Sequence, residues 1–437
     1  MFSLGRCGQV HLDTARFGRT DLPVRPIFTT GEQAMSGARE QKYRCACFCK
    51  IEAARQRRPT SGPCQGAPWM TGRQGKNVLL DLIVLIFPHY MKVLITGSSG
   101  LIGSEAVAYY DRDGHEVHGI DNNMRREFFG PQGDTRWNLE RLRQGTKKFI
   151  HHELDIRDRA GMLDLFKKEK FDLVVHCAAQ PSHDKAKEIP LVDFDVNAGA
   201  TINLLEATRL TNLDAVFIFM STNKVYGDSP NEVPLKELPT RWDYARSEDF
   251  NGISESCRID RTTHSVFGAS KTAADVMAQE YGRYFGMKVG VFRGGCLTGE
   301  HHSGVQLHGF LSYLVKVALA GETYNVLGYK GKQVRDQIHS SDVLAAFAEF
   351  TKNPRPGEVY NLGGGRENSA SILECIEKIE GLTGKKISWK YVDQARVGDH
   401  ICYISDLTKL KTHYPNWKIR RSLDEILARM CQSPVLK

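Results

Sequence analysis

The stretch from Met91 to Asp121 constrains the fold of this chain more than any other. It reads MKVLITGSSGLIGSEAVAYYDRDGHEVHGID, which is an apolar strand, a glycine-rich turn, a helix and a second strand that ends in an acid. Gly97 permits a sharp turn off the strand, Gly100 removes a Cβ that would keep a pyrophosphate away, and Gly103 lets the helix lie close to the sheet. The helix N-terminus then faces the phosphates. The pattern predicts a dinucleotide-binding βαβ unit.

The acid at the end of the second strand indicates which dinucleotide binds. A carboxylate there accepts hydrogen bonds from both hydroxyls of an adenosine ribose, so Asp121 favours NAD over its 2′-phosphorylated relative. Arg125 and Arg126 follow Asp121 closely and weaken the preference for NAD, because an arginine there can accommodate a 2′-phosphate. We therefore expect NAD as the cofactor.

Further strands and helices alternate along the chain after this unit. Strands are predicted at 149–153, 171–176 and 215–220, and helices after 157 and over 190–210. This alternation predicts an α/β fold with a Rossmann-type parallel sheet. Beyond Phe292 the strict alternation stops, which predicts a smaller C-terminal α/β substrate domain. We expect an NAD-binding Rossmann domain at 91–293 and a mainly substrate-binding domain at 294–437.

Residues that directly follow the predicted strands are the candidate ligand contacts, because parallel sheets bind ligands at the carboxyl ends of their strands. Asp155 follows the third strand and either bonds the adenine amino group or is a solvated loop acid. Small residues follow His176 and leave room for a cofactor. The predicted NAD contacts in this part of the chain are Gly97, Gly100, Leu101, Ile102, Gly103, Asp121, Asn122, Asp155, Ile156, Ala178, Ala179 and Asn197.

The charge of the chain is unevenly placed. The net charge is +8, but residues 1–90 hold 13 Lys and Arg against 6 Asp and Glu, whereas the remainder holds 46 against 45. No stacking aromatics alternate with basic strands in this near-neutral body, so we expect no nucleic-acid binding. Residues 1–76 lack a sustained apolar period and are rich in Arg, Gly, Pro and Ser, so we expect residues 1–90 to be a disordered basic extension.

Targeting and metal signals are weak. The apolar segment 78–87 is too short to cross a bilayer and contains Asp81, so we expect no membrane span; an arginine-rich transit peptide is an alternative.

Of the 11 cysteines, five precede residue 91, including a CysAlaCysPheCys run at 45–49. A second ligand pair at zinc spacing is missing from the sequence, so we expect no metal site. The scattered cysteines beyond are typical of a reduced, cytoplasmic protein.

Three motifs carry a resemblance to a known family: SerThrAsnLysValTyrGly at 221–227, PheGlyAlaSerLys at 267–271 and GlyLysGlnValArgAsp at 331–336. With them, the chain from Met91 almost to its end resembles the extended short-chain dehydrogenases/reductases of the NAD-dependent epimerase/dehydratase family. It is most similar to the CDP-paratose (CDP-tyvelose) 2-epimerases. The resemblance implies transient oxidation of a nucleotide sugar and return of the same hydride to the opposite face.

The resemblance also implies roles for individual residues. Thr222 would hydrogen-bond the reacting sugar hydroxyl, and Lys271 would bind the nicotinamide ribose and lower a neighbouring pKa. Asn223 adjoins the substrate, and neither it nor Lys224 is a carboxylate, which disfavours dehydration because eliminating water needs a carboxyl acid and a carboxyl base. Members of the family dimerise through the helices near 190–210 and 265–285, so we expect a homodimer or a higher homo-oligomer.

One residue departs from the family pattern. The family has a catalytic Tyr four residues before the Lys, and this chain has Phe267 there. A phenyl ring cannot accept a proton, so another group must: Thr222 relaying to water, Lys271 with a depressed pKa, or an imidazole such as His183 or His264. Two alternatives to an epimerase follow, namely a dehydrogenase that releases NADH and a catalytically silent NAD and nucleotide-sugar binding protein.

Arginines of the C-terminal half are candidate substrate ligands. Arg335 and Arg396 match positions where the family places arginines on the sugar-nucleotide pyrophosphate, and guanidinium forks bind phosphate oxygens bidentately. A surface salt bridge is the alternative for each. Arg293, after the sixth strand, is expected near the sugar. His301 and His302 are expected to be loop residues rather than metal ligands.

Overall fold

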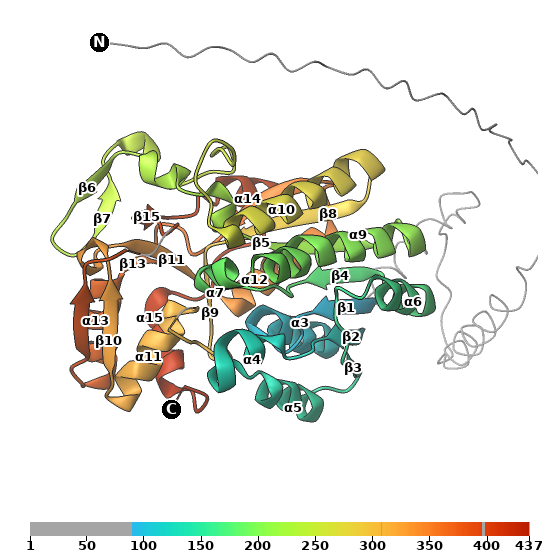
Figure 1. Cartoon of the computed structure of the whole chain (residues 1–437), viewed down its shortest axis with the longest axis horizontal. Helices are drawn as coiled ribbons and strands as arrows, with labels where there is room; N and C mark the ends of the chain where they lie inside the picture. Colours follow the sequence, from blue (N-terminus) through green and yellow to red (C-terminus); the bar gives the residue numbers. More distant parts are fainter. Residues whose placement is uncertain (1–89, 307, 396–397, 437) are drawn as a thin grey trace, which may run out of the picture. The chain divides into compact units, whose positions relative to one another are not determined.

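The computed structural model describes residues 90–306, 308–395 and 398–436 (Figure 1). The apolar segment 78–87, the cysteine run at 45–49 and Arg396 lie outside the described residues. No helix in the described ranges is long and apolar enough to cross a membrane.

A seven-stranded parallel sheet organises the fold. Its strands are β1 (Lys92–Thr96), β2 (Glu116–Ile120), β3 (Phe149–His152), β4 (Leu173–His176), β5 (Val216–Thr222), β8 (Lys288–Gly294) and β12 (Glu358–Leu362). They lie in the order β12-β8-β5-β4-β1-β2-β3, and each neighbouring pair is parallel. The predicted Rossmann-type sheet is confirmed.

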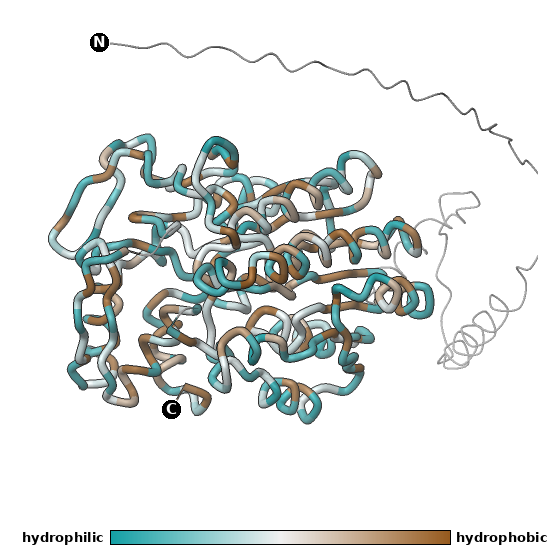
Figure 2. The backbone as a smooth tube through the Cα atoms, in the orientation of Figure 1, coloured by the Kyte–Doolittle hydropathy of each residue, from teal (hydrophilic) through white to brown (hydrophobic). Residues whose placement is uncertain are grey.

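Helices cover both faces of this sheet. Alternate residues of β1 point to opposite cores: Val93 joins one with α3 (Leu101–Arg112) and α12 (Ser340–Lys352), and Leu94 joins the other with α6 (Arg159–Glu169), α9 (Ala200–Thr211) and α10 (Val266–Phe285). Figure 1 shows α3 and α10 on opposite sides of the strands. Figure 2 shows hydrophobic residues concentrated in the central strands and hydrophilic ones at the outer turns. Burial on both faces explains why the strands are continuous apolar runs such as ValPheIlePheMet.

Two elements differ from the sequence prediction. The seventh strand, β12, comes from the range expected for the substrate domain, because α12 returns the chain to the edge of the sheet beside β8. The helix predicted over 190–210 is α8 (Pro190–Phe194) followed by a wide π turn at Asp195–Gly199 and then α9. Such a turn inserts an extra residue and is frequent near functional sites.

The C-terminal half adds small sheets and a third core. β10 (Thr323–Leu327) pairs with β14 (Ser388–Val392), while β11 (Val334–His339) joins β9 (Cys296–Thr298), β13 (Ser369–Ser371) and β15 (Cys402–Tyr403). The third core packs α11 (Phe310–Ala320), α13 (Ile372–Thr383) and α15 (Leu423–Gln432). The remaining elements are α4 (Met124–Phe129), α5 (Arg136–Gly145), α7 (His183–Glu188), α14 (Thr408–His413), β6 (Leu235–Glu237) and β7 (Trp242–Tyr244).

Candidate active site

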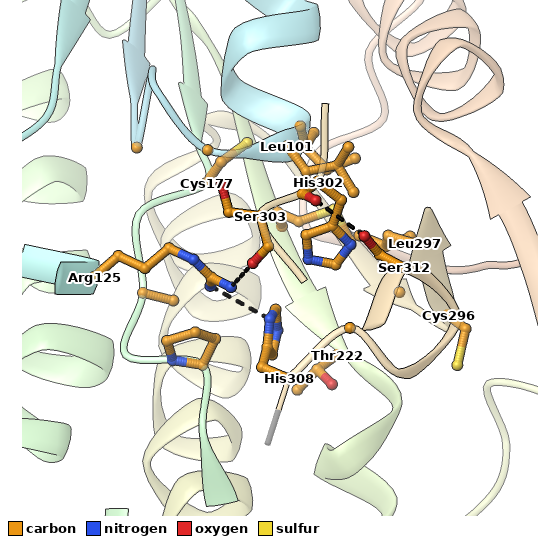
Figure 3. A pocket seen from close by; sticks show the side chains of 18 of the residues that line it. Leu101, Arg125, Cys177, Thr222, Cys296, Leu297, His302, Ser303, His308 and Ser312 are labelled. Carbon is orange, nitrogen blue, oxygen red and sulfur yellow. Dashed lines mark hydrogen bonds between the residues drawn. The ribbon is translucent and has the colours of Figure 1, made fainter. Parts of the chain in front are cut away.

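A cavity of about 470 Å³ lies at the carboxyl ends of the parallel strands. One wall is formed by the glycine turn after β1 and by the residues after β2, β3 and β4. The other comes from β9, β10, β11 and the segment 301–312. Figure 3 shows Cys177 and Thr222 among the side chains of this cavity, with Ser303 and His308 close to Arg125. The cavity therefore joins the predicted cofactor half and the predicted substrate half in one space.

The glycine turn has the geometry that a pyrophosphate needs. Gly97 has φ +66°, and a Cβ there would be 2.9 Å from the Ala178 backbone. A Cβ on Gly103 would collide with the Gly97 carbonyl oxygen, so both positions require glycine. α3 starts at Leu101, and no side chain of the described residues caps its first turn, which leaves helix N–H groups for a phosphate.

Asp121 adjoins this turn. Its Oδ2 accepts the Ser99 N–H at 2.9 Å, and its Oδ1 accepts the Asn123 N–H at 2.8 Å. Burial raises the pKa of Asp121, although both backbone hydrogen bonds oppose that shift. Each oxygen keeps a lone pair for a ribose hydroxyl. The glycine turn, the helix N-terminus and this carboxylate together fit NAD.

Arg125, beside Asp121, is engaged by the 301–312 segment. Its guanidinium donates to the Ser303 carbonyl at 2.7 Å and lies 3.3 Å from Nδ1 of His308 (Figure 3). Burial lowers the pKa of Arg125 to about 10. The side chain therefore links the cofactor end of the cavity to the loop of His301 and His302, to which the sequence analysis assigned no role at the cofactor site. The polar run HisHisSerGly at 301–304 was the available signal.

Most predicted NAD contacts line the cavity, and one does not. Asp155 is in the lining, where Arg157 binds both of its oxygens and holds its pKa below the usual range. The lining residues found in the described part of the chain do not include Asn197. Its side chain instead holds Gln180 through both backbone groups and also donates to Ser270. Asn197 thus positions the segment after β4 rather than facing the cofactor space. The other predicted contacts in the lining are Gly97, Gly100, Leu101, Ile102, Gly103, Asp121, Asn122, Ile156, Ala178, Ala179 and Lys271.

Thr222, Phe267 and Lys271 all line the cavity. Thr222 ends β5 and its Oγ accepts the Lys224 N–H at 3.2 Å. Phe267 and Lys271 stand one turn apart on α10. The Lys271 ammonium donates to the Met220 carbonyl at 3.0 Å, and burial lowers the pKa of this lysine to about 8. The three residues predicted from the motifs are therefore brought together.

A buried charge cluster forms the substrate side of the cavity. Arg335 donates to the Asp399 carboxylate and, at 2.6 Å, to the His400 carbonyl. The Lys224 ammonium donates to the Gly398 carbonyl at 2.9 Å and lies 3.5 Å from Asp399. Burial alone would raise the pKa of Asp399, but Arg335 and Lys224 hold it well below its usual range. Two cations against one anion leave a positive charge for a diphosphate. The roles of Lys224 and Asp399 in this cluster were not predicted from the sequence.

The expected placement of Arg293 at the sugar does not match its contacts. The cavity lining, as found in the described ranges, does not include it. Its guanidinium forms a two-point ion pair with Asp275 and lies 4.9 Å from the centre of the Tyr226 ring. The buried carboxylate attracts the guanidinium to the interior between β8 and α10. His301 and His302, in contrast, do line the cavity, and burial lowers the pKa of His302 to about 3, so it is neutral there.

Comparison with known proteins agrees with this geometry. Residues 93–363 match the NAD dependent epimerase/dehydratase family. A CDP-paratose 2-epimerase from Salmonella typhi is 31% identical over 348 residues, which span 78% of this chain and 98% of that protein. A UDP-glucose 4-epimerase from Bos taurus is 31% identical over 358 residues, which span 78% of this chain and 94% of that protein.

A solved structure extends the likeness to three dimensions. The UDP-glucose 4-epimerase of Stenotrophomonas maltophila, with bound NAD and formylated UDP-arabinopyranose, superposes with a TM-score of 0.63 at 25% identity and covers 78% of this chain and 97% of that one. The chain therefore belongs to the NAD-dependent epimerase/dehydratase family, with NAD as its cofactor. The family resemblance drawn from the three sequence motifs is confirmed.

Proposed function

We propose that this protein is a nucleotide-sugar epimerase that inverts C2 of a CDP-hexose. The observation that carries the proposal is the single cavity, which joins the glycine turn, the Thr222 and Lys271 pair, and the buried Arg335 cluster. Bound NAD supplies a hydride acceptor that takes hydrogen from a sugar carbon and returns it. The likeness to the CDP-paratose 2-epimerase supports cytidine as the nucleoside of the substrate and C2 as the carbon that is inverted.

The residues of the glycine turn would hold the pyrophosphate of NAD, Asp121 its adenosine ribose and Lys271 its nicotinamide ribose. Thr222 would donate a hydrogen bond to the sugar oxygen. The Lys271 cation stabilises negative charge that develops on that oxygen as the carbon is oxidised, because a buried ammonium acts in a region of low dielectric constant.

The substrate side favours epimerisation over dehydration. Asn223 and Lys224 line the cavity where a dehydratase needs two carboxyl groups. Arg335 would bind the diphosphate through N–H groups that Asp399 orients, and the cation of Lys224 lies beside the same carboxylate. Arg396, two residues before the described Gly398, is proposed as a second diphosphate ligand.

The test is incubation of the purified protein with CDP-, UDP- and GDP-hexoses in deuterated water, followed by NMR of the sugar and by absorbance of NADH. We expect C2 inversion of a CDP-hexose, no net NADH and no deuterium at C2, since a hydride carried on NAD does not exchange with solvent. Deuterium at C2 would refute the hydride shuttle. Stoichiometric NADH would identify a dehydrogenase, and no turnover of any sugar would favour a binding protein.

We also propose that the protein forms a homodimer through α8, α9 and α10. These helices pack on one another and carry exposed apolar side chains on their outer surfaces. These exposed side chains are Leu191, Phe194, Leu210, Val266, Val276, Tyr284 and Phe285. Exposed apolar side chains gathered on neighbouring helices are typical of interaction sites. Light scattering of the protein and of a Leu191→Glu variant tests this: a dimer that becomes a monomer is expected, and a monomeric parent refutes it.

A further inference from the structure

We infer that the His183 imidazole accepts the proton of the reacting sugar hydroxyl, in place of the tyrosine that Phe267 replaces. The inference rests on the proposed function and names the base for the same reaction. The sequence offers four candidate proton acceptors, namely Thr222, Lys271, His183 and His264. The contacts of each in the structure distinguish between them.

Three of the candidates are less suited than His183 to accept the proton. The His264 Nε2 lies 2.8 Å from the Val225 carbonyl, and the lining found in the described residues does not include His264. The Lys271 ammonium points to the Met220 carbonyl and lies 4.2 Å from the centre of the Phe219 ring, so it is held against β5. The Thr222 hydroxyl has no basicity of its own and needs a further acceptor.

His183 is both in the cavity and beside the altered position. Its ring centre is 4.9 Å from that of Phe267, and the two rings are tilted by 51°. His183 is the first residue of α7, and Phe267 lies in the first turn of α10. Ser182 caps α7 by accepting the Lys185 N–H at 3.2 Å, which orients this end of the helix. The His183 imidazole is thus in contact with the ring that stands at the position of the family tyrosine.

On the opposite wall of the cavity, Gly398 lies beside the His183 imidazole. Gly398 has φ +72°, and a Cβ there would lie 3.8 Å from Nδ1 of His183 and 3.5 Å from Cβ of Ser265. The Lys224 ammonium binds the carbonyl of this glycine at 2.9 Å. The buried charge cluster on the substrate side and the imidazole therefore adjoin the same short segment.

Charged side chains of several elements line the cavity that contains His183, and Asp184 follows His183 in the chain. Cations favour the neutral imidazole, which is the form that can accept a proton, and carboxylates oppose that effect. The cations are Lys271, Lys224 and Arg335, and the carboxylates are Asp399 on the opposite wall and Asp184 on α7 itself.

The proton transfer balances without a further reactant. The O–H bond of the sugar hydroxyl breaks and an N–H bond forms on the imidazole, while the carbon gives its hydride to the NAD of the proposed function and the C–O bond becomes a carbonyl. On return of the hydride, the imidazolium gives the same proton back to the oxygen. His183 ends each turnover neutral.

The experiment compares His183→Ala, the double variant His183→Ala with Phe267→Tyr, and the control His264→Asn. We expect His183→Ala to lower kcat by roughly 100- to 10,000-fold with near-unchanged KM and NAD affinity. His264→Asn should stay within a few fold of the parent. The double variant should regain at least about tenfold, because the Lys271 cation lowers the pKa of a tyrosine on the same helix turn and the resulting phenolate can accept a proton. The acid limb of its pH–rate profile should move accordingly.

Rescue at a different position distinguishes a proton acceptor from a structural residue. Retention of kcat by His183→Ala would overturn the inference. So would a loss of kcat that Phe267→Tyr does not restore, with the acid limb of the pH–rate profile unchanged. If the parent protein turns over no nucleotide sugar, both the proposed function and this inference fail. If the parent and the His183→Ala variant are both active, the proposed function stands and only the role of His183 is refuted.

Discussion

Replacement of Arg293 by alanine should destabilise the fold rather than weaken substrate binding. The Arg293 guanidinium donates to both oxygens of Asp275, at 3.1 and 2.8 Å, and the side chains are 4% and 0% exposed. Ser221 and Gln279 each donate one further hydrogen bond of 2.6 Å to the same carboxylate. Arg293→Ala leaves the buried carboxylate with these two neutral donors and the attraction of the Lys271 ammonium.

The expected cost follows from that burial. Removing one partner of a buried ion pair costs about 3–5 kcal/mol, because the remaining charge is desolvated without compensation. For a chain of this length, such a loss lowers the melting temperature by roughly 3–7 °C. The KM for the nucleotide sugar should stay close to that of the parent, since Arg293 is not part of the cavity lining in the described ranges.

Thermal unfolding followed by circular dichroism at pH 7 measures the effect. Arg136→Ala is the matched control, because its guanidinium is 3.9 Å from Glu153 and both side chains are largely exposed, so about 0–1 kcal/mol is expected. Replacing the pair together, by Arg293→Met and Asp275→Leu, should recover most of the loss. An unchanged melting temperature with a raised KM would refute the reasoning and return Arg293 to the substrate.

Three further predictions concern the cofactor, the substrate and the N-terminal segment. Asp121→Ala should weaken NAD binding by roughly 10- to 100-fold in calorimetry and spare NADP, because a charge-assisted hydrogen bond is lost; equal affinity of the parent for both cofactors would contradict this. Arg335→Ala should raise the substrate KM far more than it affects NAD binding, with partial recovery in Arg335→Lys, whereas an unchanged KM would make Arg335 structural. A chain shortened to residues 91–437 should still bind NAD, and loss of binding would show that the removed segment contributes.

The first βαβ unit was predictable because its requirements are local. A strand that turns sharply at a residue with positive φ needs glycine, and close packing of the following helix needs a second one, so Gly97 and Gly103 could be recognised by spacing alone. The strands were recognisable as short apolar runs buried on both faces, and their observed ends agree with the predicted ones within two residues. Placement of Asp121 at the cavity follows from the same unit.

The long-range pairings were not predictable from these local patterns. Nothing in the spacing of Arg293 or Asn197 indicates that a buried Asp275 or the Gln180 backbone will hold them away from the cavity. Nor does the pattern after residue 292 indicate that β12 will pair with β8, because pairing depends on where α12 returns the chain.

The sequence by itself determined the nucleotide-binding unit, the parallel sheet and the loss of the family tyrosine at Phe267. Only the tertiary structure decided what stands beside that ring. His183 follows the fourth strand, Phe267 opens α10 and Gly398 precedes β15, yet the three meet at one side of the cavity. The physical reason is that local sterics fix turns and periodicities, whereas the neighbours of a side chain depend on how separate elements pack.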